Sequence, residues 1–285
     1  MVWDGVVAGY LYLAGIGAGS FVFGALAVRA NPEARRTKLI CLVIGLAAVG
    51  IGTLLLVADA RAGLMNPARF FLLLSNFESV MSWGVLLIML FMAVAAVELI
   101  FYWRSADVRR FDYLGCAVAF GVAVYTGALL GAVGAYPLWH PVVLPMLFVV
   151  SAASTGFAAG ILGSRFFDSE QFKSLVFYKK ALLALPLIEA VLLALLLILT
   201  ANAPAPASAA GVATVSGLIV GRHAPMFWIG LVILGIAFPI AADRLVAKSG
   251  EGRGLLLAGE AGVLAGGFFL RYLIIVAAVP MVALM

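Results

Sequence analysis

Eight long apolar segments limit what this chain can fold into. They run through the 285 residues and are divided by short stretches that carry charges and prolines. A helix needs about 20 apolar residues to cross a bilayer. Only 11% of the residues are charged, against roughly 25% in a soluble domain. We therefore predict an all-α integral membrane protein, a single polytopic domain over residues 1–285. Its eight predicted transmembrane helices cover residues 6–28, 39–60, 80–102, 113–135, 142–164, 180–201, 224–243 and 258–283.

The positive charges predict how the helices are oriented. Of the 18 Lys and Arg residues, 14 lie in the loops that follow odd-numbered segments, and three lie in the other loops and the termini. Cytoplasmic loops carry an excess of Lys and Arg, so we expect both termini on the outer side of the membrane. The start of the chain, Met1–Asp4, has no basic residues of a secretory signal, so the first segment should remain as a span.

The residue counts also exclude several classes of function. An iron–sulfur cluster normally needs four closely spaced thiolates, and the chain has only Cys41 and Cys116, far apart. A di-haem cytochrome b needs two pairs of histidines within its spans, and the chain has only His140 and His223, near the predicted outer surface. We expect no haem and no cluster on this chain. The net charge of +5 reflects the basic loops, so we expect no nucleic-acid partner.

Two charged residues lie deep within predicted spans. Counted along the helix axis, Glu189 lies about 14 Å from the inner end of its span and Arg271 about 20 Å from that of its own. A charge at mid-bilayer costs at least roughly 2.5–3.5 kcal/mol on insertion scales, so each needs a partner or a purpose. They could form a buried ion pair that fixes helix register, or one step of a proton path. Glu98, Asp243 and Glu260 lie nearer the inner ends, where we expect them to reach water or pair with loop arginines. A role in proton entry is the alternative for these three residues.

Small residues recur at the spacing that allows close helix packing in lipid. We expect helix contacts at three pairs: Gly15 and Gly19, Gly127 and Gly131, and Gly262 and Gly266.

Polar side chains gather at the predicted outer ends of the helices. They are Tyr10, Asp59, Glu78, Tyr125 and His140. A quinone site needs donors for two carbonyl oxygens, proton carriers and an apolar wall for the ring and tail. We expect Tyr125 and either Tyr10 or His140 to bind the headgroup oxygens. Asp59 or Glu78 would exchange protons with the outer aqueous phase, and Glu189 and Arg271 would link the site to the cytoplasm.

Four segments carry a family resemblance. They are Tyr10 to Gly19; Asp59 through Asn66-Pro67-Ala68-Arg69-Phe70 to Asn76 and Ser82-Trp83-Gly84; Tyr125-Thr126-Gly127 with Pro137-Leu138-Trp139; and Leu270-Arg271-Tyr272. In this order and spacing, the chain resembles the NrfD/polysulphide reductase membrane-subunit family, the quinone-interacting integral subunits of respiratory oxidoreductases. The second segment is the most specific of the four.

The resemblance implies an eight-helix fold of two four-helix bundles in the cytoplasmic membrane of a bacterium or archaeon. It implies menaquinone or ubiquinone as the bound carrier, with Tyr125 as a hydrogen-bond donor to it. It also implies a four-cluster ferredoxin-like iron–sulfur subunit, docked on the outer face, and commonly a molybdopterin catalytic subunit. The chain alone would then not act on the terminal substrate.

Two other functions stay open from the sequence. A secondary transporter would show helices broken at mid-membrane in two matching halves; Pro186 and Pro239 interrupt two segments, but no inverted pair is evident. A purely structural anchor would hold a catalytic partner without binding quinone. A quinone found in the purified protein would separate these alternatives.

Overall fold

The computed structural model is all-helical in the part it describes, residues 5–59, 78–104, 109–167, 176–249 and 253–281. Within these described residues, eight helical segments are long and apolar enough to cross a membrane, as predicted, so the chain is a multi-pass integral membrane protein. In chain order the helices are α1 (Gly5–Ala30), α2 (Arg35–Asp59), α5 (Val80–Trp103), α6 (Arg109–Gly131), α7 (Val143–Phe167), α9 (Val176–Ala201), α10 (Ser208–Ile219), η1 (Met226–Ala237), α11 (Phe238–Ser249) and α12 (Arg253–Val276).

Two features of this architecture differ from the sequence-based expectation. The segment between the sixth and seventh spans contains α10, an apolar helix of 12 residues and about 18 Å, which is too short to cross a bilayer. The last span ends at Val276 instead of at residue 283. Beyond it the backbone finds other partners: the amide of Val279 donates to Thr214 Oγ1 and that of Met281 to the carbonyl of Ala135. Pro280 also disfavours helix at the residue before it.

The seventh span is built from two helical types in succession. Its first part, η1, is π-helical over 12 residues, whereas π-helix usually occurs as single turns. Its second part, α11, is α-helical and has Pro239 as its second residue. Proline has no backbone N–H to donate. The change from π-helix to α-helix therefore falls next to Pro239, where one backbone hydrogen bond of the helix is missing.

The glycine pairs mark where helices touch. A methyl group built on Gly19 would lie 2.0 Å from the carbonyl oxygen of Ala152, so α1 and α7 cross with their backbones in contact. A methyl group on Gly266 would lie 2.2 Å from the Cα of Gly235, so α12 and η1 do the same. Close approach of this kind is what small residues permit in lipid. These contacts confirm the packing role predicted for the glycines.

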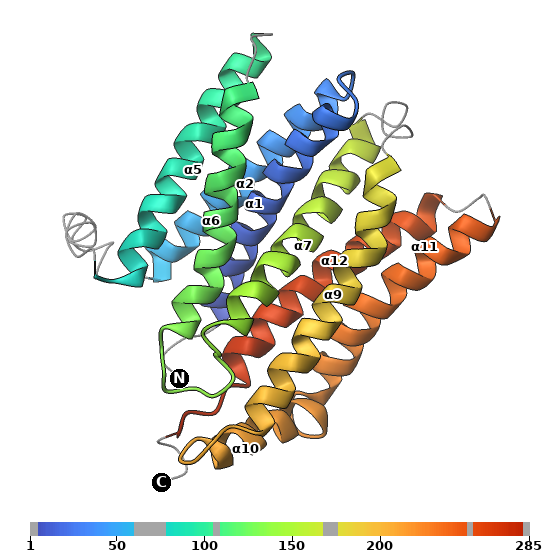
Figure 1. Ribbon diagram of the computed structural model, residues 1–285. Helices are drawn as coiled ribbons and strands as arrows, with labels where there is room; N and C mark the ends of the chain where they lie inside the picture. Colours follow the sequence, from blue (N-terminus) through green and yellow to red (C-terminus); the bar gives the residue numbers. More distant parts are fainter. Residues whose placement is uncertain (1–4, 60–77, 105–108, 168–175, 250–252, 282–285) are drawn as a thin grey trace.

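Helix α1 lies at the centre of the assembly, where it contacts α2, α6, α7 and α12. It begins at the end of the molecule where α12 finishes, and the short helix α10 lies at this same end (Figure 1). The ends of α1, α5, α7 and α11 and the starts of α2, α6, α9 and α12 lie at the opposite end (Figure 1). These helix ends carry most of the arginines and lysines, so this end is called here the arginine-rich end.

Candidate functional site

A narrow pocket lies between α1, α2, α5 and α6, in the half of the helices away from the arginine-rich end. Its wall is mostly apolar, and the polar side chains that line it are Tyr10, Thr53, Tyr125 and Thr126. Thr53 donates to the carbonyl of Val49 and Thr126 to that of Ala123. Their hydroxyl hydrogens are thus used within their own helices, and the phenol groups of Tyr10 and Tyr125 line the same pocket.

The Tyr125 ring packs against the backbone of α5 at Gly84. Tyr125 is only 7% exposed, and its ring lies directly on the backbone of α5: a methyl group built on Gly84 would be 1.7 Å from its Cζ atom. No hydrogen-bond partner of the Tyr125 hydroxyl is found among the described residues. The structure thus brings together Tyr125 and Tyr10, and it assigns to Gly84 a positioning role that sequence reasoning missed. The signal was present, because Gly84 closes the Ser82-Trp83-Gly84 motif.

The other predicted outer-face residues lie elsewhere. His140 does not line the pocket. Its Nδ1 accepts from the backbone amides of Val142 and Val143, at 3.3 and 3.4 Å, and so caps the start of α7. Glu78 is exposed just before α5. Asp59 is the last residue of α2, and its side chain, like residues 60–77, lies outside the described residues.

A second polar group lies at mid-depth, between α1, α7, α9 and α12. Arg271 is fully buried, and its Nη1 donates to Ser151 Oγ at 3.0 Å and to the carbonyl of Gly267 at 3.1 Å. A methyl group on Gly15 would lie 2.4 Å from its Nη2 atom, so this glycine makes room for the guanidinium. Gly15 is near the middle of α1. The Arg271 guanidinium beside it therefore lies near the middle of the α1 span.

Glu189 belongs to the same group without touching Arg271. Both are buried, yet no direct ion pair between them is found in the described part of the chain. Ser151 is a hydrogen-bonding neighbour of both the carboxylate and the guanidinium. The two charges are therefore joined through a hydroxyl, instead of by the direct pair considered from the sequence. Ser151 was missed because nothing distinguishes it, in sequence, from the other small polar residues of its span.

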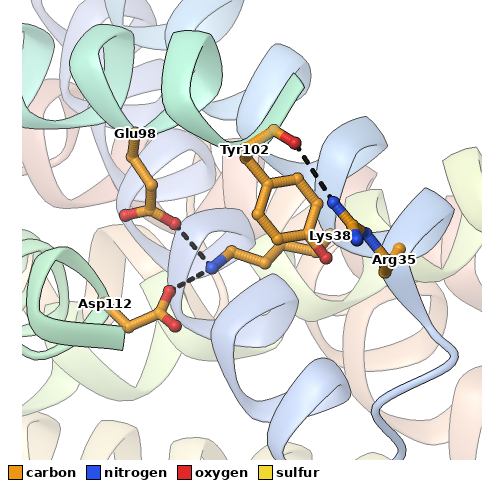
Figure 2. Close-up of polar contacts among 5 residues, drawn as sticks. All are labelled: Arg35, Lys38, Glu98, Tyr102 and Asp112. Atoms are coloured by element: carbon orange, nitrogen blue, oxygen red, sulfur yellow. Dashed lines mark hydrogen bonds and ion pairs between the residues drawn. The ribbon is translucent and has the colours of Figure 1, made fainter. Parts of the chain in front are cut away.

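A third polar group lies near the arginine-rich end. Lys38 of α2 forms an ion pair with Glu98 of α5 at 2.7 Å and another with Asp112 of α6. Figure 2 shows its ammonium group between the two carboxylates, with the ring of Tyr102 beside its side chain. We expected Glu98 to reach water or a loop arginine, but it is fully buried and its partner is a lysine within a helix. These two ion pairs link α2, α5 and α6.

Within the described ranges, no three His, Cys, Asp or Glu side chains lie close enough together to hold a metal ion. Trp139, which closes the Pro137-Leu138-Trp139 motif, is only 4% exposed and donates from its indole N–H to the carbonyl of Ile274 at 2.8 Å. It therefore packs within the protein.

Comparison with known proteins gives a consistent result. The sequence profile of the family described as "Polysulphide reductase, NrfD" matches residues 1–283. The protein is 31% identical to the C subunit of the polysulfide reductase of Wolinella succinogenes, over 97% of its own length and 94% of that subunit. It is 29% identical to protein NrfD of Escherichia coli, over 97% of its own length and 95% of that protein.

A more distant relative comes from an archaeon. The protein is 28% identical to the Hdr-like menaquinol oxidoreductase integral membrane subunit of Archaeoglobus fulgidus, over 84% of its own length and 61% of that subunit. The profile match covers nearly the whole sequence, and the first relative exceeds 30% identity over nearly the full length of both proteins. The chain therefore belongs to the polysulphide reductase, NrfD family.

Proposed function

We propose that this protein is the quinone-binding membrane subunit of a respiratory oxidoreductase, and that it passes electrons between the quinone pool and an iron–sulfur partner. The observation that carries the proposal is the pocket lined by Tyr10 and Tyr125, in which the Tyr125 hydroxyl has no hydrogen-bond partner among the residues that the structure describes. An unpartnered phenol in an apolar wall suits a lipid-soluble ligand with carbonyl oxygens. The name of the archaeal relative, a menaquinol oxidoreductase subunit, supports menaquinone over ubiquinone.

The roles of the residues follow from their positions. Tyr125 donates a hydrogen bond to one headgroup oxygen and Tyr10 binds the other; Tyr10 is favoured over His140 because it lines the pocket and His140 caps α7. Bound quinol supplies two electrons and two protons. Glu78 or Asp59, at the same end of the helices, exchanges protons with the aqueous phase. The Arg271, Ser151 and Glu189 group provides a polar step at mid-depth for proton movement.

The pocket must open for a quinone to bind. The space within it that the centre of a water molecule can reach is about 10 Å³, which is room for about one water. A ring and its tail enter once side chains along the pocket turn toward the lipid. The lining residues on the side away from α1 and α6 are Val49, Gly52, Thr53 and Leu56 of α2 and Ile88 of α5.

The proposed assembly has two bundles and an outward docking face. The helices α1, α2, α5 and α6 contact one another in a closed ring, and α7, α9, the η1–α11 span and α12 form a second, which supports two four-helix bundles. With the arginine-rich end in the cytoplasm, the Tyr125 pocket lies toward the outer face of a bacterial or archaeal cytoplasmic membrane. The iron–sulfur subunit docks there, with a molybdopterin catalytic subunit bound to it. A short distance to the first cluster favours electron transfer.

The test removes one oxygen atom. In Tyr125→Phe, the purified complex should lose most of its quinol-linked reduction of the partner's clusters, by about tenfold, the equivalent of a hydrogen bond worth roughly 1.4 kcal/mol. Tyr136→Phe is the matched control, because Tyr136 is at the same end and packs with its ring tilted against Trp139, outside the pocket. Unchanged rates in Tyr125→Phe would remove this residue from the site, and absence of bound quinone from the active complex would refute the proposal.

A further inference from the structure

One face of α1 is exposed near the arginine-rich end, although α1 lies at the centre of the assembly. Two of its rings mark where it meets its neighbours. A methyl group built on Gly115 of α6 would collide with the Phe21 ring, and one built on Gly160 of α7 would collide with the Phe23 ring. Leu26 points between these two directions around the helix and is 39% exposed. The surface of α1 between its contacts with α6 and α7 is therefore open.

This surface is open because α6 and α7 separate toward the arginine-rich end. At the other end they touch: a methyl group built on Gly127 would lie 2.5 Å from the Cα of Pro145, and one on Gly131 would lie 2.9 Å from that of Pro141. Figure 1 shows the two helices drawing apart toward the arginine-rich end, with α1 between them. Membrane lipid can therefore reach α1 at this level.

The open surface is an apolar strip that ends in an arginine. On α1, Val22, Leu26 and Arg29 follow one another at spacings of four and three, so they share a helix face. On α6, Tyr113 and Phe120 share a face and are 61% and 60% exposed. The two helices are joined here, because Arg29 Nη2 donates to the Tyr113 hydroxyl at 2.7 Å. These five residues are called the Arg29 face.

The Arg29 guanidinium has donor groups to spare. Its Nη2 binds Tyr113, and its Cζ lies 5.0 Å from the centre of that ring. No ion pair between Arg29 and a carboxylate is found among the described residues. Asp112, in the first turn of α6, is already paired with Lys38. Arg110 is exposed and shares a helix face with Tyr113. The polar end of the Arg29 face is thus positively charged.

A phospholipid with an anionic headgroup matches both parts of this face. A guanidinium binds phosphate oxygens through charge-assisted hydrogen bonds, and Arg29 lies in the last turn of α1, at the depth where headgroups meet water. The strip below it offers Leu26 and Phe120 to an acyl chain. Basic pockets between transmembrane helices on the cytoplasmic side are a recurrent form of lipid site. A free anion would use the arginine and leave the apolar strip uncovered.

We propose that the Arg29 face binds an anionic phospholipid, with its phosphate on Arg29 and one acyl chain against Leu26, between α6 and α7. Tyr113 holds the guanidinium in position through its hydroxyl group. The lipid occupies the space between one proposed bundle, which contains α6, and the other, which contains α7, and so stabilises their packing. The site is separate from the Tyr125 pocket in the other half of the helices, and it does not depend on quinone binding.

The experiment measures lipid binding to the purified whole complex in detergent by native mass spectrometry. The first phosphatidylglycerol should bind at least about fivefold more tightly than the first phosphatidylcholine with the same acyl chains. Arg29→Gln should weaken binding of this phosphatidylglycerol by about fivefold, as expected for one basic residue beside an anionic lipid. Arg244→Gln is the matched control, because Arg244 is exposed at the same end, on α11, which packs against α9, η1 and α12. It should leave the binding unchanged.

A second variant tests the apolar part of the site. Leu26→Trp keeps every charge and fills the place of the acyl chain with a large ring. It should therefore lower the occupancy of the first phosphatidylglycerol, and it keeps the proposal testable should Arg29→Gln fail to assemble. Inorganic phosphate is the probe for a free anion and should not displace the lipid.

Several results would overturn the proposal. They are equal binding of the two lipids by the wild-type complex, an equal loss of binding in Arg244→Gln, and unchanged binding in both Arg29→Gln and Leu26→Trp. Displacement of the lipid by inorganic phosphate would show an anion site without a lipid. A protein of the complex that crosslinks to Tyr113 and excludes the lipid would show a protein interface instead. Quinol oxidation is measured separately, so none of these results affects the proposed function.

Discussion

The contact between Gly84 and Tyr125 gives the sharpest test of the site. In Gly84→Ala, the new methyl group would lie 1.7 Å from the Cζ atom of Tyr125 and 2.0 Å from its Cε2 atom. Ordinary contact between carbon atoms begins near 3.5 Å, so the ring must retreat by roughly 1.8 Å. A hydrogen bond of about 2.8 Å does not survive such a shift, because bonds weaken beyond about 3.0 Å for O–H donors.

The expected magnitude follows from that displacement. Loss of one neutral hydrogen bond lowers affinity by about 0.5–1.5 kcal/mol, and a misplacement of about 1 Å in a reacting site can lower the rate by up to about a hundredfold. We expect Gly84→Ala to reduce quinol-linked reduction of the partner's clusters by between about tenfold and a hundredfold. The rate should be measured over a range of quinol concentrations, with the melting temperature of each purified complex alongside.

Two controls separate positioning from general damage. Gly134→Ala adds the same methyl group near the same end of the molecule, where nothing lies within 4 Å, and should leave the rate unchanged. In a Tyr125→Phe background, Gly84→Ala should cause little further loss, because the hydroxyl that it displaces is already absent. Wild-type kinetics in Gly84→Ala, or equal and additive losses in the double variant, would refute the argument that Gly84 acts by placing the Tyr125 hydroxyl.

Two further predictions concern the buried charges. Lys38→Met leaves Glu98 buried without its partner and should destabilise the fold by about 3–5 kcal/mol; the melting temperature in detergent should recover when Glu98→Gln is added, and a double variant as unstable as the single one would contradict this. Glu189→Gln should abolish proton movement in proteoliposomes while sparing electron transfer from quinol. If protons still cross, the path does not use Glu189.

The polar groups show how far sequence reasoning extends. Tyr10 and Tyr125 were selected from their helices and share one pocket, because both lie in the same half of neighbouring spans. Periodicity gives the depth of a residue and the face of its helix, but not the neighbouring side chain. For that reason the sequence allows His140 as a ligand, although in the structure its ring caps α7. For the same reason the sequence suggests a loop arginine as the partner of Glu98, although the partner in the structure is Lys38 of α2.

The sequence by itself determined the number of spans, because the length of apolar segments that crosses a bilayer is set by the bilayer and by the rise of the α-helix. It also indicated the close glycine contacts, since small residues at a spacing of four leave few alternatives in lipid. Only the tertiary structure decided which groups meet at mid-depth. Ser151 between Arg271 and Glu189, and Gly84 beneath Tyr125, depend on how helices far apart in the sequence cross, and the packing of side chains from several helices fixes those crossings together.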